Sequence, residues 1–306
     1  MMNGILVVNK PAGLTSQQVV GRARRILGMK KIGHTGTLDP DVTGVLPLCL
    51  GTATRVAEYL LDQAKAYRGE VTFGWSSTTQ DASGEVVEQV EEVHLTEEAV
   101  RAAFDSFIGT ISQIPPAYSA IKIDGKRAYD LARQGEDVEI PARNVTIYKL
   151  EIHELELDMP HPKVRFTVEC SKGTYVRTLC HDLGQKLGVP AHMSHLVRTR
   201  SGPFTLEQAM TLEEIEAAVG DGTIEQRLQP LGAAIPHMTV HVVPEVLERR
   251  VHNGRDFTIK KVLPDVEVGS LIRMETRGGQ LLALYRVESF ADGETHTLPE
   301  KVFKEQ

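Results

Sequence analysis

Cysteine is scarce in this sequence, and long apolar runs are missing. The three cysteines, Cys49, Cys170 and Cys180, are odd in number and show no Cys-x-x-Cys spacing, which argues against a disulfide framework and a zinc site. A membrane-spanning helix needs about 18 apolar residues, a length that no run approaches. The first residues also lack the basic and apolar regions of a signal peptide. We therefore expect a cytoplasmic protein without a metal or a membrane partner.

Several common catalytic signatures are also missing. The chain contains no Gly-Lys-Ser/Thr of a P-loop, no Gly-x-Ser-x-Gly and no His-Glu-x-x-His. The spacing of Asp39, Asp41 and Thr43 imitates the start of a calcium loop, but Leu50 stands where the bidentate glutamate is required. These absences argue against a P-loop nucleotidase, a serine hydrolase of this type, a zinc protease and a calcium site.

The net charge of -7 at first argues against an RNA partner, because phosphate neutralisation by Lys and Arg dominates such binding. The distribution of charge matters more than its sum. Residues 1–31 contain six basic residues and no acidic one, whereas Asp and Glu gather in 85–105 and 207–225. The basic segment is either a track for RNA phosphates or the charged outer face of an ordinary amphipathic helix.

A coarse reading of the chain gives helices and strands that do not alternate regularly. Apolar patterning predicts strands at 5–8, 44–50, 67–73, 145–157 and 163–170, and helices after Thr15, Thr96 and Thr174. The absence of regular βαβ units favours an α+β fold with a mostly antiparallel sheet. A length of 306 residues favours two domains. We place the main domain at 1–235 and a small β-rich module at 236–306, where short strands alternate with Gly-containing turns.

The most informative segment is the glycine-rich loop at 33–44. Pro40 biases Asp39 toward an extended conformation, and Gly33, Gly36 and Gly44 allow the backbone to turn tightly around it. The apolar run at 45–50 predicts a buried strand that anchors the loop. On these residues alone, the loop is either a structural turn or a site that presents one carboxylate.

Several separate segments, in order, resemble the TruB family of bacterial pseudouridine synthases, which act on uridine 55 in the T-loop of tRNA. The matching segments are 4–16, 31–40, 65–67, 78–84, 115–122, 125–133, 171–179 and 195–204. One departure is Asn9, where the family pattern has Asp. The resemblance implies a pseudouridine-synthase fold and, at 236–306, a PUA-like RNA-binding domain. The alternative for that module is a stabilising appendage without RNA contact.

The resemblance also implies a cofactor-free active site. It assigns Asp39 as the nucleophile or base and Arg177 as the guanidinium that keeps Asp39 ionised. Tyr67 resembles the tyrosine that stacks on the target uracil, and Tyr175 resembles the tyrosine beside C5. His34 is expected to fill the gap left by the flipped base. The alternatives are core aromatics for the tyrosines and a loop-ordering role for His34.

Further basic residues are candidates for contacts with RNA phosphates. Candidate phosphate contacts are basic residues in the first segment and near residue 200, and each could equally be a solvated charge: Lys10, Arg22, Arg25, Lys31, Arg198 and Arg200. The expected partner is the tRNA T-arm, with no obligate protein partner.

Three functions remain open: a stand-alone tRNA pseudouridine synthase, an RNA-guided pseudouridylase, and a catalytically silent RNA-binding or RNA-folding module. The RNA-guided family carries a longer, very basic terminal extension that this acidic sequence lacks, and the intact candidate residues argue against the silent module. We therefore expect the stand-alone enzyme.

Overall fold

The computed structural model describes residues 2–118, 122–123, 126–127 and 140–304. The chain divides into two compact units. The first unit contains the residues up to Pro40, Val45–Leu61 and the residues from Gly202 on, and the second contains Asp41–Gly44 and Asp62–Ser201. The chain thus passes from the first unit into the second directly after Pro40.

The N-terminal part of the first unit contains β1 (Gly4–Lys10), α1 (Ser16–Ile26), β2 (Ile32–His34) and most of β3 (Thr43–Leu50). Helix α1 begins as expected: Thr15 and Gln18 form a capping box, in which each side chain accepts from the other residue's backbone N–H. Val19, Val20 and Ala23 are fully buried and pack in one core cluster with β1, β3 and α6 (Leu212–Gly220). The predicted first strand and helix are confirmed.

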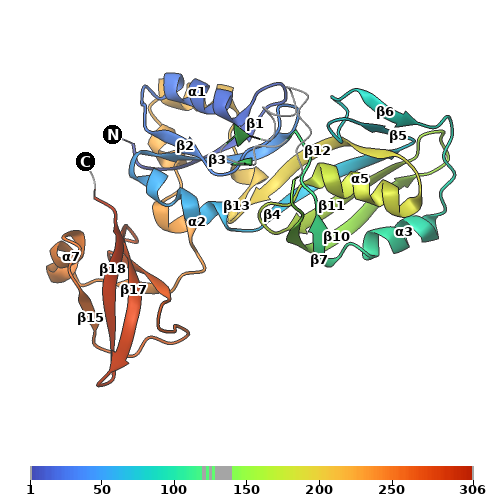
Figure 1. Cartoon of the computed structure of the whole chain (residues 1–306). Coiled ribbons are helices and arrows are strands. Elements are labelled where there is room, and N and C mark those ends of the chain that lie inside the picture. Colours follow the sequence, from blue (N-terminus) through green and yellow to red (C-terminus); the bar gives the residue numbers. More distant parts are fainter. Residues whose placement is uncertain (1, 119–121, 124–125, 128–139, 305–306) are drawn as a thin grey trace. The chain divides into compact units, whose positions relative to one another are not determined.

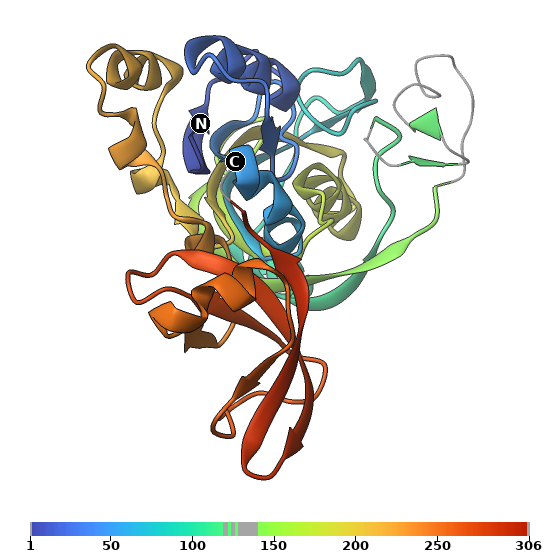
Figure 2. The same ribbon diagram turned by 90° about the vertical axis from the view of Figure 1, so that its left-hand side faces the viewer.

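The C-terminal part of the first unit is a five-stranded sheet with the order β14-β16-β17-β18-β15. Helix α7 (Glu245–His252) packs against β17 and β18 (Figure 2). The strands are β14 (Val240–Val242), β15 (Phe257–Ile259), β16 (Leu271–Glu275), β17 (Leu281–Ala291) and β18 (Glu294–Val302). The expected β-rich module is confirmed, although the patterning did not indicate β18.

Shorter elements complete the first unit. They are the helix α2 (Ala57–Leu61), the strand β13 (Phe204–Thr205), and the 3-10 helices η1 (Gly51–Arg55), η2 (Leu206–Gln208), η3 (Ile224–Arg227) and η4 (Leu231–Ala234). Leu281, Leu284 and Phe303 share a core cluster with Ile5 and Val7. Because of this cluster, the two ends of the chain belong to one unit, and the boundary at residues 235 and 236 stays a prediction.

The second unit is built on the antiparallel strand order β12-β4-β11-β10-β7 (Figure 1). These strands are β12 (Ala191–Ser201), β4 (Lys65–Phe73), β11 (Lys163–Cys170), β10 (Arg143–Glu156) and β7 (Gly109–Gln113). Helices α3 (Glu97–Asp105) and α5 (Val176–Leu187) pack against this sheet and each other. Two hairpins, β5 (Trp75–Ser77) with β6 (Val86–Gln89) and β8 (Lys122–Ile123) with β9 (Lys126–Arg127), lie outside it. The predicted α+β class with a mostly antiparallel sheet is confirmed.

The core of the second unit lies between the sheet and its helices. Phe104 of α3 and Phe166 of β11 are buried and meet edge to face, with ring centroids 5.7 Å apart. Leu179 and Leu183 bury the apolar face of α5. The packing fixes α5, and with it the residues at its start.

Within the described part of the chain, no helix is long and apolar enough to span a membrane.

Candidate active site

Hydrogen bonds within the first unit hold the backbone of the loop on both sides of Asp39. Before Asp39, the backbone N–H of Leu38 donates to Ser16 Oγ at 2.8 Å. After it, the carbonyl oxygen of Pro40 accepts from Gly13 N at 3.0 Å and from Lys10 Nζ at 2.7 Å. Asp39 itself is partly exposed. The loop therefore presents this carboxylate from a backbone that is held by its neighbours.

Lys10 contacts the Asp39 loop from inside the protein. Its side chain is fully buried, and Nζ donates to the carbonyl oxygens of Pro11, Leu14 and Pro40. Three acceptors match the three donors of an ammonium group, so these bonds compensate the burial of its charge. Lys10 therefore holds the backbone of the Asp39 loop from inside, and its contact with RNA phosphate stays a prediction.

Two of the three loop glycines adopt a backbone conformation that favours glycine. Gly36 and Gly44 have φ values of 102° and 104°, whereas Gly33 has no positive φ and lies in β2. A Cβ at Gly44 would clash with the backbone of Arg198. Gly44 is thus required where β3 begins beside β12, and Gly33 is not required for the turn.

Tyr67 and Arg198 are partners in the second unit. They face each other in the register of β4 and β12, and their side chains form a hydrogen bond in which the guanidinium donates to the phenol oxygen. Arg198 is only 1% exposed. Burial lowers the pKa of Arg198, and the charge and hydrogen bond of Tyr67 act in the opposite direction. The guanidinium of Arg198 thus lies inside and contacts Tyr67, and a phosphate contact at Arg198 stays a prediction.

Arg177 lies at the start of α5 and is 5% exposed. Its guanidinium donates to the carbonyl oxygens of Thr79 at 2.9 Å and Tyr118 at 3.0 Å. It also lies 3.7 Å from the carboxylate of Asp81, which accepts from Ser83 N and Ser83 Oγ. These contacts hold Arg177 in one orientation. Sequence reasoning did not indicate Asp81, although it lies within the matching segment 78–84.

The other candidates occupy more exposed positions. Arg22 and Arg25 lie on the exposed face of α1, and neither forms an ion pair with another described residue. Lys31 is exposed next to β2. His34 ends β2 and is partly exposed. Arg200 already forms an ion pair with Glu169.

The candidates are divided between the two units. Asp39 and His34 belong to the first unit, whereas Tyr67, Tyr175 and Arg177 belong to the second. The pairing of Asp39 with Arg177 therefore stays a prediction. The chain crosses between the units four times, after Pro40, Gly44, Leu61 and Ser201. The first crossing follows Pro40, the neighbour of Asp39, and Gly44 pairs with Arg198 in β12.

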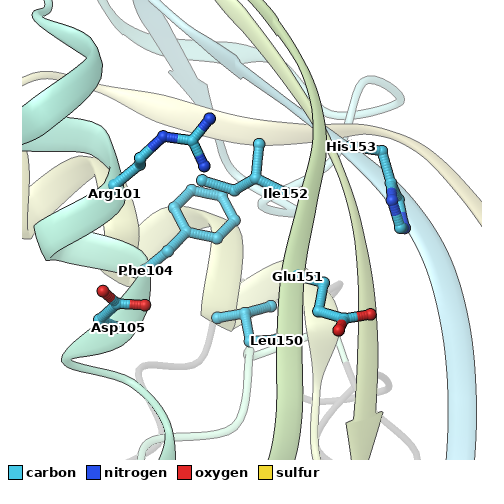
Figure 3. Close-up of a pocket in the computed structure, with 7 residues that line it drawn as sticks. All are labelled: Arg101, Phe104, Asp105, Leu150, Glu151, Ile152 and His153. Atoms are coloured by element: carbon cyan, nitrogen blue, oxygen red, sulfur yellow. The ribbon is translucent and has the colours of Figure 1, made fainter.

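A pocket of about 470 Å³ lies elsewhere in the second unit, between α3 and β10. Figure 3 shows its lining, which combines the basic Arg101 and the acidic Asp105 and Glu151 with Phe104 and His153. None of the candidate catalytic residues lines this pocket. This pocket is therefore separate from the candidate residues of β4 and of the start of α5 in the same unit.

Comparison with known proteins gives two family matches. The model described as "TruB family pseudouridylate synthase (N terminal domain)" matches residues 24–176. The model described as "tRNA pseudouridylate synthase B C-terminal domain" matches residues 177–235. Together they include Asp39, Tyr67, Tyr175 and Arg177.

Relatives named tRNA pseudouridine synthase B match over most of their length. The chain is 45% identical to the relative from Halalkalibacterium halodurans over 304 residues, which is 98% of this chain and 97% of that protein. It is 44% identical to the relative from Bacillus subtilis (strain 168) over 287 residues, 93% of each chain.

Among solved structures, the chain is similar to one in "Crystal Structure of a Cbf5-Nop10-Gar1 Complex". That match has a TM-score of 0.77 and 29% identity and covers 99% of this chain and 85% of the other. A chain in "Structure of H/ACA RNP bound to a substrate RNA containing 2'-deoxyuridine" gives a TM-score of 0.76 and 28% identity, with the same coverage of each chain.

Proposed function

This chain belongs to the TruB family and is a tRNA pseudouridine synthase, an isomerase; from this premise we propose that it converts uridine 55 of the T-loop by means of Asp39. The observation that carries the proposal is the Asp39 loop itself. Lys10, Ser16 and Gly13 hold the backbone on both sides of Asp39, and Asp39 remains partly exposed. A fixed and accessible carboxylate is what a nucleophile or base requires.

The reaction needs no outside group. The bond between ribose C1′ and uracil N1 breaks, the base turns, a bond forms between C1′ and C5, and the C5 hydrogen leaves as a proton while N1 takes one up. Asp39 acts on the base, on C1′ or on the C2′ hydrogen, and each of these routes uses the ionised carboxylate. We therefore expect turnover without a metal or redox cofactor.

We assign supporting roles to side chains of the second unit. Arg177 supplies a positive charge that favours the ionised form of Asp39, and its fixed orientation by the carbonyl oxygens of Thr79 and Tyr118 supports this role. Tyr67 stacks on the flipped uracil, a contact worth about 1 to 3 kcal/mol. Tyr175 lies beside C5 as the candidate proton acceptor.

RNA binding is assigned to exposed groups. Arg22, Arg25 and Lys31 are exposed and form the proposed phosphate track. His34 takes the place of the flipped base. Arg200 contacts phosphate only if it exchanges its partner Glu169. The module at 236–306 is proposed to bind RNA as well.

The second candidate function is RNA-guided pseudouridylation, because the similar solved structures include a substrate-bound H/ACA ribonucleoprotein. The two functions differ in whether a guide RNA is needed. A bare T-arm transcript, labelled with tritium at uridine C5, distinguishes them. We expect tritium release into water by the purified chain alone, and no release when uridine 55 is replaced by cytidine. A requirement for guide RNA would favour the second candidate.

The same assay tests Asp39. Asp39→Asn should abolish tritium release and leave tRNA affinity nearly unchanged, because the amide keeps the shape but loses the charge that attacks or removes a proton. The matched control is Asp41→Asn, an exposed carboxylate close in sequence, which should retain activity. Normal release by the Asp39 variant would refute the assignment.

A further inference from the structure

Gln113, at the end of β7, contacts the backbone of Tyr175 with both ends of its side-chain amide. Its Nε2 donates to the carbonyl oxygen of Tyr175 at 3.0 Å, and its Oε1 accepts from the Tyr175 N–H at 2.8 Å. Gln113 is 1% exposed. An amide that uses both its donor and its acceptor on one residue fixes the place and the rotation of that peptide segment.

Arg143, at the start of β10, contacts the ring of the same tyrosine. Its guanidinium carbon lies 5.6 Å from the centroid of the Tyr175 ring, a cation-π arrangement. Arg143 is the direct cross-strand partner of Gln113 in the antiparallel pair of β10 and β7. Directly opposed residues project from the same face of a sheet. Gln113 and Arg143, on the edge strand β7 and its neighbour β10, therefore contact the backbone and the ring of Tyr175 from one face.

These contacts exceed what the helix start requires. Tyr175 is the N-cap residue of α5, and its carbonyl oxygen already accepts the first helical bond from Leu179 N at 3.0 Å. An N-cap side chain stabilises a helix by accepting from the N–H of the second or third helical residue. Gln113 instead binds the N–H and carbonyl oxygen of Tyr175 itself. The contact therefore orients this tyrosine in addition to supporting the helix.

We propose that Gln113 and Arg143 are positioning residues for pseudouridine formation, which hold Tyr175 in the orientation that the C5 step needs. Gln113 sets the place of the Tyr175 backbone, and Arg143 sets the plane of its ring. The inference rests on the proposed role of Tyr175. Both residues come from strands that are distant in sequence from α5, and both act on the reaction through Tyr175.

The first test is Gln113→Met, which keeps the length of the side chain and removes both hydrogen bonds. The single-turnover rate should fall roughly 10- to 100-fold, as expected for a misplaced reacting group, while tRNA affinity stays at the wild-type value. Exchange of the Tyr175 amide hydrogen, followed by NMR, should accelerate by about tenfold or more because its acceptor is lost. The matched control is Ser112→Ala, an exposed residue on the same strand, which should change none of these quantities.

The second test is Arg143→Met, which remains available if the Gln113 variant does not fold, because Arg143 is partly exposed. In protein labelled with fluorotyrosine, the Tyr175 resonance, identified by its loss in Tyr175→Phe, should shift in the Arg143 variant, and the single-turnover rate should fall at unchanged tRNA affinity. The proposal is overturned if either variant alters the surroundings of Tyr175 without slowing turnover, or leaves them unaltered. If wild-type protein releases no tritium, the proposed function fails, whereas amide exchange and the fluorine spectrum still report whether the two residues hold Tyr175.

Discussion

Lys65 brings a positive charge into β4, two residues from Tyr67 and close to the buried Arg198. It is 7% exposed, and Nζ donates to the carbonyl oxygen of Gln63 at 2.6 Å. Burial, followed by the charge of Arg198, lowers the pKa of Lys65 to about 8. The ordinary value in an unfolded chain is about 10.4, so the folded protein holds this proton less tightly than the unfolded chain does.

This difference predicts how stability depends on pH. Between pH 8 and about 10.4 the unfolded chain binds more protons at Lys65, so this residue makes the free energy of unfolding rise with pH across that window. Lys65→Met removes the titrating group. In this variant, the free energy of unfolding, measured by urea denaturation, should no longer include the rise that Lys65 causes. The change across the pH window should differ from that of the wild type by at most about 3 kcal/mol. If the free energy of unfolding changes with pH in the same way in both proteins, Lys65 is not the group responsible for the rise.

The junction between the Asp39 loop and β3 depends on a close approach of two strands. Gly44 and Arg198 are partners in the parallel pairing of β3 and β12, and a side chain at Gly44 would meet the Arg198 backbone. Arg198 in turn donates to Tyr67. A change at this junction therefore affects both the strand pairing and the contact to the tyrosine.

Gly44→Ala should destabilise the protein by about 2 to 4 kcal/mol, because it combines a positive φ with a clash against backbone. It should also reduce turnover. Gly33→Ala is the matched control from the same loop: it has no positive φ, and a Cβ there meets nothing within 4 Å. Urea denaturation and tritium release of the two variants test the prediction. Equal free energies of unfolding for the two variants would contradict the prediction, because the clash between a Cβ at position 44 and the Arg198 backbone would then have no cost.

On the scale of the whole molecule, a chain with a net charge of -7 binds a polyanion through local groups of exposed cations. Burial divides the basic residues into two sets. Lys10 and Arg198 are inside and hold other parts of the protein, whereas Arg22 and Arg25 are exposed on α1. The second set has charges available to release counterions from RNA.

Arg22→Gln combined with Arg25→Gln should weaken binding of all RNAs alike and lower the salt dependence by about 0.7 to 0.9 per lost contact. Turnover of bound tRNA should persist.

Tyr67→Leu should have the opposite pattern of effects. It should lower the single-turnover rate and leave the salt dependence of tRNA binding unchanged, because stacking carries no charge. Binding titrations at several salt concentrations measure both effects. An unchanged slope in the double variant would leave α1 with an ordinary solvated face.

The sequence alone determined the local elements, and it singled out the Asp39 loop as the candidate for the chemistry. The capped helix α1 and the strand Lys163–Cys170 have the expected extents, because caps and apolar periodicity act over neighbouring residues. Strands β12 and β18 were missed, since their polar and charged residues obscure the apolar alternation and only pairing with neighbouring strands orders them. Tertiary structure also decided which cations face inward, and it placed Gln113 against Tyr175. Such environments arise from contacts between residues distant in the sequence, so no local pattern records them.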